Sequence, residues 1–325
     1  MGKFKVLVTR PVPEQVEQYI DAHCEAVYWR HQGMMSKEWF LEHVPDVEGI
    51  VGAGVRVDSG LLEAAHRLKV ISNVSVGYNN FDTDLMKKHG VLGTNTPYVL
   101  DDTVADLIVA LMLSAARRIP ELDQLVKQGN WQRGMDAELF GVDLHHSKVG
   151  IIGMGRIGEE VARRARFGFQ CEIMYHNRSR KPEIEAELDA VYGSLSDVLT
   201  SCDFIVLMTP FTAETKHLIG KDQFASMKRT AVFVNASRGA TVDEEALYHA
   251  LSSGQILAAG LDVFQQEPLP AGHPLTQLVN AVTLPHIGSA TEQTRFDMAM
   301  DAAKSMVAVL QGKRPISIVA ELKDV

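Results

Sequence analysis

The stretch that decides the fold spans residues 148–180 and reads KVGIIGMGRIGEEVARRARFGFQCEIMYHNRSR. An apolar strand, Val149 to Ile152, runs directly into a glycine-rich turn that opens a helix, and a second strand follows at Cys171 to Tyr175. A strand, a helix and a strand in this order predict a βαβ unit, whose two strands lie parallel in one sheet.

The three glycines of the turn each have a separate task. Gly153 permits the tight turn, Gly155 lets the backbone approach a pyrophosphate, and Gly158 allows the helix to pack closely on the strand. The phosphates would lie at the positively polarised N-terminus of the helix. The pattern therefore predicts a dinucleotide site that includes Gly153, Gly155, Arg156, Ile157 and Gly158.

The end of the second strand indicates which dinucleotide is bound. An NAD site normally has Asp or Glu about 20 residues past the glycines, where it binds the ribose 2′-hydroxyl. This chain has His176-Asn177-Arg178-Ser179-Arg180 there, without an acid. A 2′-phosphate would accept charge-assisted hydrogen bonds from Arg178, with Asn177, Ser179 and Arg180 as further donors. The sequence favours NADP(H). NAD(H) is the alternative if the two arginines are ordinary surface residues.

Composition narrows the class of protein. With 325 residues, 46% of them hydrophobic, the chain is long enough for two domains. A net charge of −9 argues against nucleic acids and anionic membranes as partners. The three cysteines show no metal-ligand spacing, and we expect no metal site. No apolar run approaches about 18 residues and the N-terminus reads as a strand, so we expect a cytoplasmic protein that does not contact a membrane.

The order of predicted elements indicates two α/β domains. Residues 1–100 alternate short strands with helical patterns, and a helix-periodic segment then runs from Asp101 to Lys127, with Pro120 expected to end or kink it. Strands recur up to residue 284, and a last helical run, Glu292 to Leu310, follows. We predict a Rossmann-type doubly wound parallel sheet in residues 101–290. A smaller flavodoxin-like α/β domain would be built from residues 1–100 and 291–325.

Three polar residues follow strands of the predicted larger sheet. Arg238 comes after an apolar strand at residues 231–234, Glu267 after one ending near residue 264, and His286 after one at residues 282–284. The carboxyl ends of parallel strands share one rim, where ligands bind. A guanidinium can clamp a carboxylate, an imidazolium can protonate a carbonyl oxygen, and a carboxylate can orient the imidazole. Each residue alone has an ordinary structural explanation, but together they suit the reduction of a 2-keto acid.

Over nearly its whole length the chain resembles the D-isomer-specific 2-hydroxyacid dehydrogenases. Within that family it is most similar to the glyoxylate/hydroxypyruvate reductases, in the bacterial form also called 2-ketogluconate reductase. The resemblance implies reduction of glyoxylate, hydroxypyruvate or 2-keto-D-gluconate to a D-2-hydroxy acid with NADPH. The motifs that carry it are Ser75-Val76-Gly77-Tyr78, Thr103-Val104-Ala105-Asp106, Gly150 to Gly158, Asn235 to Gly239, Gly260-Leu261-Asp262-Val263-Phe264, Glu267-Pro268 and Pro285 to Thr291.

The resemblance also implies roles for individual residues. Arg238 would bind the substrate carboxylate and carbonyl, His286 would be the acid/base, and Glu267 would be its partner. The cofactor domains would form a homodimer. Further substrate contacts would come from Ser75 and from the backbone amides of Val76 and Gly77. Further cofactor contacts would come from Thr103, Thr209, Pro210, Asp262 at the nicotinamide carboxamide, and Gly288.

Differences between this chain and other members of the family narrow the range of expected substrates. Formate dehydrogenases carry Gln where this chain has Glu267, and D-lactate dehydrogenases carry an aromatic stretch where it has Ile287-Gly288-Ser289. Phosphoglycerate dehydrogenases often have an Arg near the position of Gly52, which disfavours a phosphorylated substrate here, although Arg56 lies close by in the sequence.

Two further alternatives stay open. Trp131 matches a tryptophan that in hydroxypyruvate reductases reaches into the partner's active site, but it could equally be a packing anchor after the connecting helix. Corepressors of the same fold retain the Arg, Glu and His, so a cofactor-sensing binding protein is the alternative from another class. Such corepressors are NAD-selective, and Arg178 therefore favours the enzyme. An NAD-dependent D-2-hydroxyacid dehydrogenase is the remaining alternative.

Overall fold

The structure is a computed structural model that describes residues 2–31, 33, 35–132 and 137–325. It divides into two compact units. Unit 1 comprises Met1–Leu100 and Ala290–Val325, and unit 2 comprises Asp101–Ser289. The chain therefore passes between the units twice, at residues 100–101 and at residues 289–290.

Unit 1 is built on a five-stranded parallel sheet with strand order β2-β1-β3-β4-β5. This is the flavodoxin-like order of a doubly wound sheet. Its strands are β1 (Phe4–Val8), β2 (Cys24–Tyr28), β3 (Gly49–Gly52), β4 (Val70–Asn73) and β5 (Leu92–Thr94). Its helices are α1 (Glu14–His23), α2 (Lys37–His43), α3 (Ser59–Ala64), α4 (Thr83–His89), α12 (Glu292–Leu310) and the short 3-10 turn η5 (Ala320–Leu322).

Four elements of unit 1 were not predicted from the sequence: β2, α2, α4 and the short turn η5. Strand β2 lies at the edge of the sheet and has mostly exposed or half-exposed side chains, so it lacks an apolar run. Helices α2 and α4 are short, but both carry ordinary N-caps. The Ser36 side chain accepts from the Trp39 N–H, and Asp82 accepts from the Leu85 N–H. Those caps are the sequence signal that would have located both helices.

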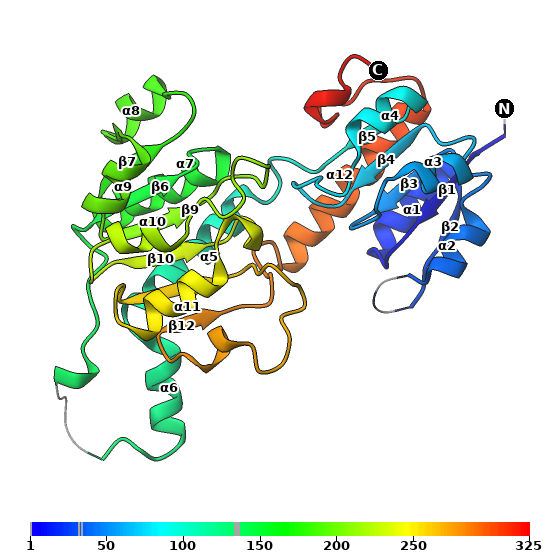
Figure 1. Cartoon of the computed structure of the whole chain (residues 1–325). Coiled ribbons are helices and arrows are strands. Elements are labelled where there is room, and N and C mark those ends of the chain that lie inside the picture. The colour runs from blue at the N-terminus through cyan, green and yellow to red at the C-terminus, as the bar shows by residue number, and fades with distance from the viewer. Residues whose placement is uncertain (1, 32, 34, 133–136) are drawn as a thin grey trace. The chain divides into compact units, whose positions relative to one another are not determined.

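Helix α12 returns the chain to unit 1 and packs on the sheet (Figure 1). It contacts β3, β4 and β5, and it buries Met298, Ala302 and Met306. A Cβ atom added to Gly49 of β3 would lie 2.9 Å from the Met306 sulfur, so the helix and the strand are in close contact. The last predicted helix is found with the bounds that the periodicity indicates.

Unit 2 contains a seven-stranded parallel sheet with strand order β12-β11-β10-β9-β6-β7-β8. Read from β8, this is the Rossmann order 3-2-1-4-5-6 with one added strand. The strands are β6 (Lys148–Ile152), β7 (Glu172–His176), β8 (Val191–Tyr192), β9 (Phe204–Leu207), β10 (Val232–Asn235), β11 (Ala258–Leu261) and β12 (Ala281–Thr283). The predicted fold class, two doubly wound α/β sheets of different size, is confirmed.

The helices of unit 2 connect and cover these strands. They are α5 (Asp101–Ala116), α6 (Ile119–Lys127), α7 (Arg156–Arg163), α8 (Pro182–Leu188), α9 (Leu195–Ser201), α10 (Lys221–Ser226) and α11 (Glu244–Ser252). Short turns add η1 (Ala137–Leu139), η3 (Gly239–Thr241) and η4 (Pro274–Gln277), and a π-helical turn η2 (Arg164–Gly168) continues α7.

Several strand boundaries in unit 2 differ from the prediction by one or two residues, and strand β8 was not predicted. The break expected at Pro120 comes earlier, since α5 ends at Ala116 and Arg118 precedes α6 with φ of +55°. Pro120 lies in the first turn of α6, where its missing N–H needs no partner. Strand β7 ends at His176 rather than Tyr175.

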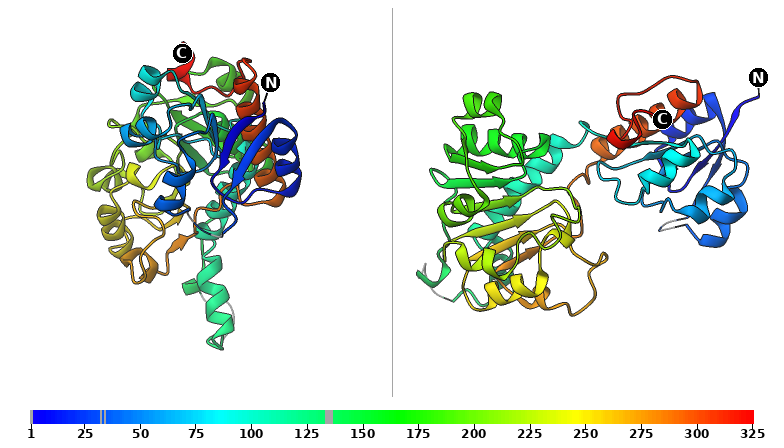
Figure 2. Two further views of the ribbon diagram at one scale, coloured as in Figure 1. Left: turned by 90° about the vertical axis from the view of Figure 1, so that its right-hand side faces the viewer. Right: turned by 45° about the horizontal axis from the view of Figure 1, so that its top comes forward.

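Helix α6 extends away from the sheet of unit 2 (Figures 1 and 2). None of its residues is buried, and Ile119 and Val126 are more than half exposed. Trp131, which follows α6, is 63% exposed. Within this chain Trp131 is therefore not a buried packing anchor, and Ile119, Val126 and Trp131 present apolar side chains to the surroundings.

Two further observations concern the state of the cysteines and the length of the helices. Cys24, Cys171 and Cys202 are buried free thiols, and burial raises the pKa of Cys24 and of Cys202 to about 11. Among the described residues, no helix is both long and apolar enough to cross a membrane.

The order of strands reverses between β6 and β9, and the glycine-rich turn leaves β6 at that point. Gly153 has φ of +102°, and a Cβ atom there would lie 2.7 Å from the carbonyl carbon of Met208, just past β9. A Cβ atom on Gly158 would lie 2.7 Å from the Gly153 oxygen. Around Gly155, by contrast, no atom lies within 4 Å of the added Cβ. The turn is packed by backbone at its two ends and open in the middle.

This difference predicts that two alanine substitutions change the free energy of unfolding by different amounts. Gly153→Ala should lower the free energy of unfolding by about 1–3 kcal/mol, because the new side chain meets backbone and an unfavourable φ. Gly155→Ala should change it by less than about 0.5 kcal/mol, because the φ of −89° at residue 155 suits alanine. Thermal unfolding of the ligand-free protein measures both. Equal losses for the two variants would contradict the packing described here.

Candidate active site

The three polar residues expected at one rim follow three adjacent strands of unit 2. Arg238 follows β10, Glu267 follows β11 and His286 follows β12, at the edge where the carboxyl ends of these strands lie, here called the carboxyl edge. The His286 Nδ1 lies 2.6 Å from the Glu267 Oε2. Arg238 is near enough to Glu267 for their charges to affect each other's pKa. The structure thus brings the three side chains together.

Glu267 uses both carboxylate oxygens. Oε2 pairs with His286, and Oε1 accepts a hydrogen bond of 2.9 Å from the Phe264 N–H. Burial opposes ionisation of Glu267, but the hydrogen bonds from His286 and Phe264 and the charge of Arg238 outweigh it and lower the pKa of Glu267. The carboxylate is therefore ionised at neutral pH. Since an ionised carboxylate only accepts, Nδ1 of His286 is the donor and Nε2 is the ring nitrogen left for a substrate.

His286 sits on a strained turn that Asp262 holds. Its φ is +53°, in the left-handed region that costs energy for a residue with a side chain. The two carboxylate oxygens of Asp262 accept from the N–H groups of Ile287 at 2.7 Å and Gly288 at 2.8 Å. Burial raises the pKa of Asp262, and these two hydrogen bonds and the charge of His286 oppose the rise. The Asp262 carboxylate therefore fixes the backbone that carries the imidazole.

This arrangement gives Asp262 a role that the sequence did not indicate. The resemblance placed Asp262 at the nicotinamide carboxamide, whereas in the structure both of its oxygens are occupied by the His286 loop. Gly288 was expected to contact the cofactor, and it is buried against Asp262 and Val104. If Asp262 also contacts a ligand, its oxygens must accept that contact in addition to the hydrogen bonds from Ile287 and Gly288.

Arg238 is held by a close backbone contact. A Cβ atom on the next residue, Gly239, would lie 1.9 Å from the carbonyl carbon of Phe264, so the loops after β10 and β11 touch backbone to backbone. The Arg238 Nη1 donates to the Ser237 carbonyl at 2.6 Å, the single hydrogen bond of this guanidinium to the described part of the chain. Burial lowers the pKa of Arg238, and Glu267 counteracts that shift. The guanidinium of Arg238 is partly desolvated and lies near the Glu267 carboxylate.

Two features suit a bound dinucleotide: open space at the glycine turn and, among the described residues, an unpaired hydroxyl just after β9. Gly155 faces open space at the N-terminus of α7. The buried hydroxyl of Thr209 has no hydrogen-bond partner among the described residues, although buried hydroxyls normally have one. Pro210 follows Thr209 and is exposed. A bound dinucleotide would supply the missing partner, so the residues fit such a cofactor.

Asn177 supports the turn rather than reaching outward. Its Oδ1 accepts from the Met154 N–H at 2.7 Å, and its Nδ2 donates to the Met154 carbonyl at 3.1 Å. The amide group that was expected to help bind a 2′-phosphate is engaged with the backbone of the glycine turn. Its contribution to the site is to hold β7 and the turn together.

The other predicted phosphate donors differ from one another. Arg178 and Ser179 are exposed after β7. Arg180 is paired with Glu185 of α8, with Nε 3.0 Å from Oε1. The pKa of Glu214, in the loop after β9, is lowered first by a hydrogen bond from Thr212 and further by the charge of Arg178. Tertiary structure thus brings an acid near Arg178 that the end of β7 itself lacks.

The remaining predicted residues are placed as follows. Thr103 lies in the first turn of α5, and Arg156 and Ile157 begin α7. In unit 1, Ser75, Val76 and Gly77 follow β4, and the Ser75 hydroxyl donates to the Gly77 carbonyl at 2.6 Å. The N–H groups of Val76 and Gly77 have no acceptor in the part of the chain that the structure describes. Within that part, no group of three or more His, Cys, Asp or Glu is placed to hold a metal ion.

Comparison with known proteins agrees with this architecture. Residues 109–288 match the family model of the NAD-binding domain of D-isomer specific 2-hydroxyacid dehydrogenases. A protein of Erwinia tasmaniensis, glyoxylate/hydroxypyruvate reductase B, is 45% identical over 314 residues, covering 96% of this chain and 97% of that protein.

Solved structures resemble the chain over almost its full length. A protein of Thermus thermophilus has a TM-score of 0.90 at 39% identity, covering 98% of this chain and 100% of that one. The NADPH-dependent glyoxylate/hydroxypyruvate reductase of Sinorhizobium meliloti, solved with NADP and malonate, has a TM-score of 0.85 at 30% identity, covering 99% and 98%. From its sequence, its two sheets and these likenesses, the chain belongs to the D-isomer specific 2-hydroxyacid dehydrogenase family.

Proposed function

We propose that this chain reduces glyoxylate and hydroxypyruvate to D-2-hydroxy acids with NADPH, with 2-keto-D-gluconate as a further substrate. The observation that carries the proposal is the His286–Glu267 pair, 2.6 Å apart, beside the partly desolvated Arg238. The name of the Erwinia relative supports the choice of substrates, and the NADP complex of the Sinorhizobium relative supports the choice of cofactor.

The chemistry of each side chain follows from its contacts. The guanidinium of Arg238 binds the keto acid's carboxylate and carbonyl oxygen, which makes the carbonyl carbon more electrophilic. His286 donates the proton of Nε2 to the carbonyl oxygen, while Glu267 holds Nδ1 and stabilises the imidazolium. In unit 1, the N–H groups of Val76 and Gly77 are suited to a carboxylate oxygen. The nicotinamide, when bound, supplies the hydride to the carbonyl carbon.

The preference for NADPH rests on Arg178. No acid ends β7, and Arg178 is an exposed guanidinium at the position where a ribose 2′-group would lie. Arg180 already pairs with Glu185 and Asn177 with Met154, so Arg178 and Ser179 remain as donors to a 2′-phosphate.

Substitution of Arg178 tests the cofactor preference. Loss of a hydrogen bond to a charged group costs about 1.5–3 kcal/mol, so Arg178→Ala should raise the KM for NADPH about 10- to 100-fold and leave that for NADH nearly unchanged. Arg180→Ala removes the same charge from a paired side chain and should have a smaller effect. NADPH and NADH oxidation with glyoxylate measures both. Wild-type protein that prefers NADH would overturn the preference.

The pH dependence of reduction tests the proton donor. Because the pKa of Glu267 lies below its usual range, its carboxylate stays ionised from pH 5 to 10 and holds the proton-donating His286, so Glu267→Gln should lower kcat/KM for reduction throughout that range. His286→Ala should lose about 10²- to 10⁴-fold in both reaction directions. Initial rates between pH 5 and 10 provide the measurement. A His286→Ala protein with near-wild-type rates would remove His286 from the mechanism.

We further propose a homodimer in which Trp131 lies in the partner's substrate site. Trp131 is 63% exposed, and α6 buries none of its residues, as expected of a segment that a second copy covers.

This proposal predicts a change in substrate discrimination. Trp131→Ala should alter the ratio of kcat/KM values for glyoxylate, hydroxypyruvate and 2-ketogluconate, while the Kd of NADPH stays the same. Steady-state kinetics with the three substrates and titration of NADPH are the measurements. Unchanged substrate ratios in a stable dimer would exclude Trp131 from the site.

A further inference from the structure

An ion pair joins the glycine-rich turn to the start of α5. The Arg156 Nε donates to the Asp101 Oδ2 at 3.0 Å. Asp101 is the first residue of α5 and of unit 2, and its side chain is only 11% exposed, whereas that of Arg156 is 41% exposed. A buried carboxylate therefore holds a guanidinium that is partly open to solvent.

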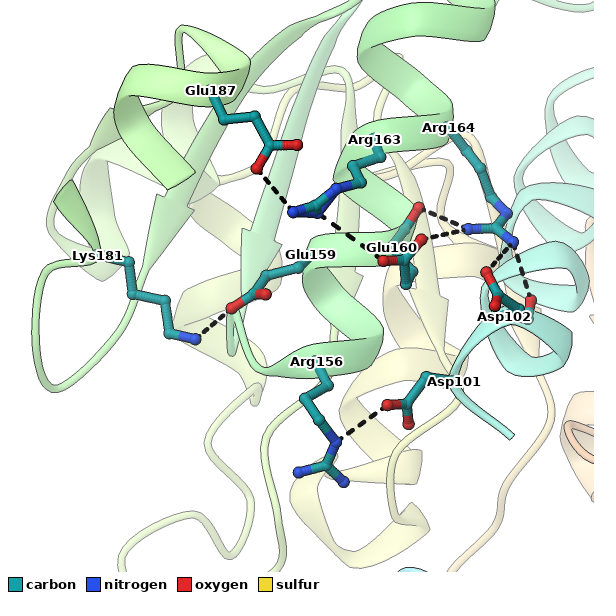
Figure 3. Close-up of polar contacts among 9 residues, drawn as sticks. All are labelled: Asp101, Asp102, Arg156, Glu159, Glu160, Arg163, Arg164, Lys181 and Glu187. Carbon is teal, nitrogen blue, oxygen red and sulfur yellow. Dashed lines mark hydrogen bonds and ion pairs between the residues drawn. The ribbon is translucent and has the colours of Figure 1, made fainter. Parts of the chain in front are cut away.

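The geometry of the pair orients the guanidinium. In Figure 3 the Arg156 side chain runs from the first turn of α7 away from the rest of that helix, with Nε turned towards Asp101. The two terminal nitrogens point away from α7, past its N-terminal end. Phosphates that bind at a helix N-terminus lie on that side. Gly155, the residue before Arg156, leaves open space at the same end.

Asp101 is itself firmly placed. Taken as a whole residue, Asp101 is 8% exposed. Its second carboxylate oxygen, Oδ1, is buried without a hydrogen-bond partner among the described residues. A carboxylate in this position would normally have more donors. The unsatisfied oxygen shows that Asp101 is not there for the packing of α5 alone, because an apolar residue would fill the same space without that cost.

We propose that Asp101 is a positioning residue for dinucleotide binding. It holds the guanidinium of Arg156 by Nε and thereby presents the terminal nitrogens to the pyrophosphate. An arginine side chain has several rotamers of similar energy, and a guanidinium fixed in advance loses less entropy when it binds a phosphate. Repulsion between the Asp101 carboxylate and the phosphates opposes this benefit. Whether Asp101→Ala raises or lowers the Kd of the dinucleotide therefore decides the proposal.

The inference rests on the dinucleotide use proposed above but not on the preference for NADPH. The pyrophosphate is common to NADPH and NADH, so Asp101→Ala should raise the Kd of both by the same factor, about 3- to 30-fold. The fragment 2′-AMP has no pyrophosphate, and its Kd should not change. Asp101→Asn keeps an acceptor for Nε and should restore much of the affinity. Calorimetric titration of the ligand-free protein gives these constants without turnover.

Two controls separate this role from a structural one. Asp102→Asn changes the same charge on the next residue, whose carboxylate pairs with Arg164 at 2.8 Å instead of Arg156, and it should leave both Kd values unchanged. In an Arg156→Ala background, Asp101→Ala should have no further effect, since the positioned group is gone. Figure 3 shows both acids on α5 and their separate partners, Arg156 on α7 and Arg164 at the start of η2.

Each outcome has one meaning. Tighter binding of NADPH and NADH by Asp101→Ala would show that repulsion dominates and would overturn the proposal, as would an equal loss for 2′-AMP. An effect of Asp101→Ala that persists without Arg156 would also overturn it. If 2′-AMP does not bind to wild-type protein, the preference for NADPH fails, while the NADPH and NADH arms still decide the role of Asp101.

Discussion

The contact between backbones at the carboxyl edge of unit 2 is the constraint on which the site depends. Gly153 lies against Met208 and Gly239 lies against Phe264, in both places too closely for any Cβ atom. A parallel sheet brings all its strand ends to one edge, and these contacts bring the loops that follow the strands close to one another. The side chains of Arg238, Glu267 and His286 are therefore positioned by main-chain packing.

A short series of hydrogen bonds then fixes the position of the His286 imidazole relative to this packed backbone. Asp262 fixes the backbone on one side of His286, and Glu267, itself fixed by the Phe264 N–H, holds the ring. The left-handed conformation of His286 costs about 1–3 kcal/mol, and such conformations persist only where the surroundings hold them. The ring is thus oriented before a ligand arrives, which is what electrostatic stabilisation of a transition state requires.

The ion pairs that join α5 to α7 and to the turn η2 act through geometry more than through stability. Asp102 and Asp106, the partners of Arg164, are largely exposed, and exposed pairs of this kind contribute about 0–1 kcal/mol. The pair of Asp101 with Arg156 differs because its carboxylate is buried and its guanidinium lies at the dinucleotide end of the helix. Similar-looking salt bridges in one row can therefore serve different purposes, and burial distinguishes them.

The sequence alone determined most of the elements and the polar residues that follow their ends. The glycine turn, the strands before Arg238, Glu267 and His286, and the last helix are local patterns, since apolar periodicity and turn residues act within a few positions. Edge strands such as β2 escaped this reasoning because half-exposed strands lack an apolar run. Only the tertiary structure joined Asp101 to Arg156, Glu214 to Arg178 and Asp262 to the His286 loop. Those partners are 25 or more residues apart in the chain, and their pairing depends on which strands become neighbours in the sheet.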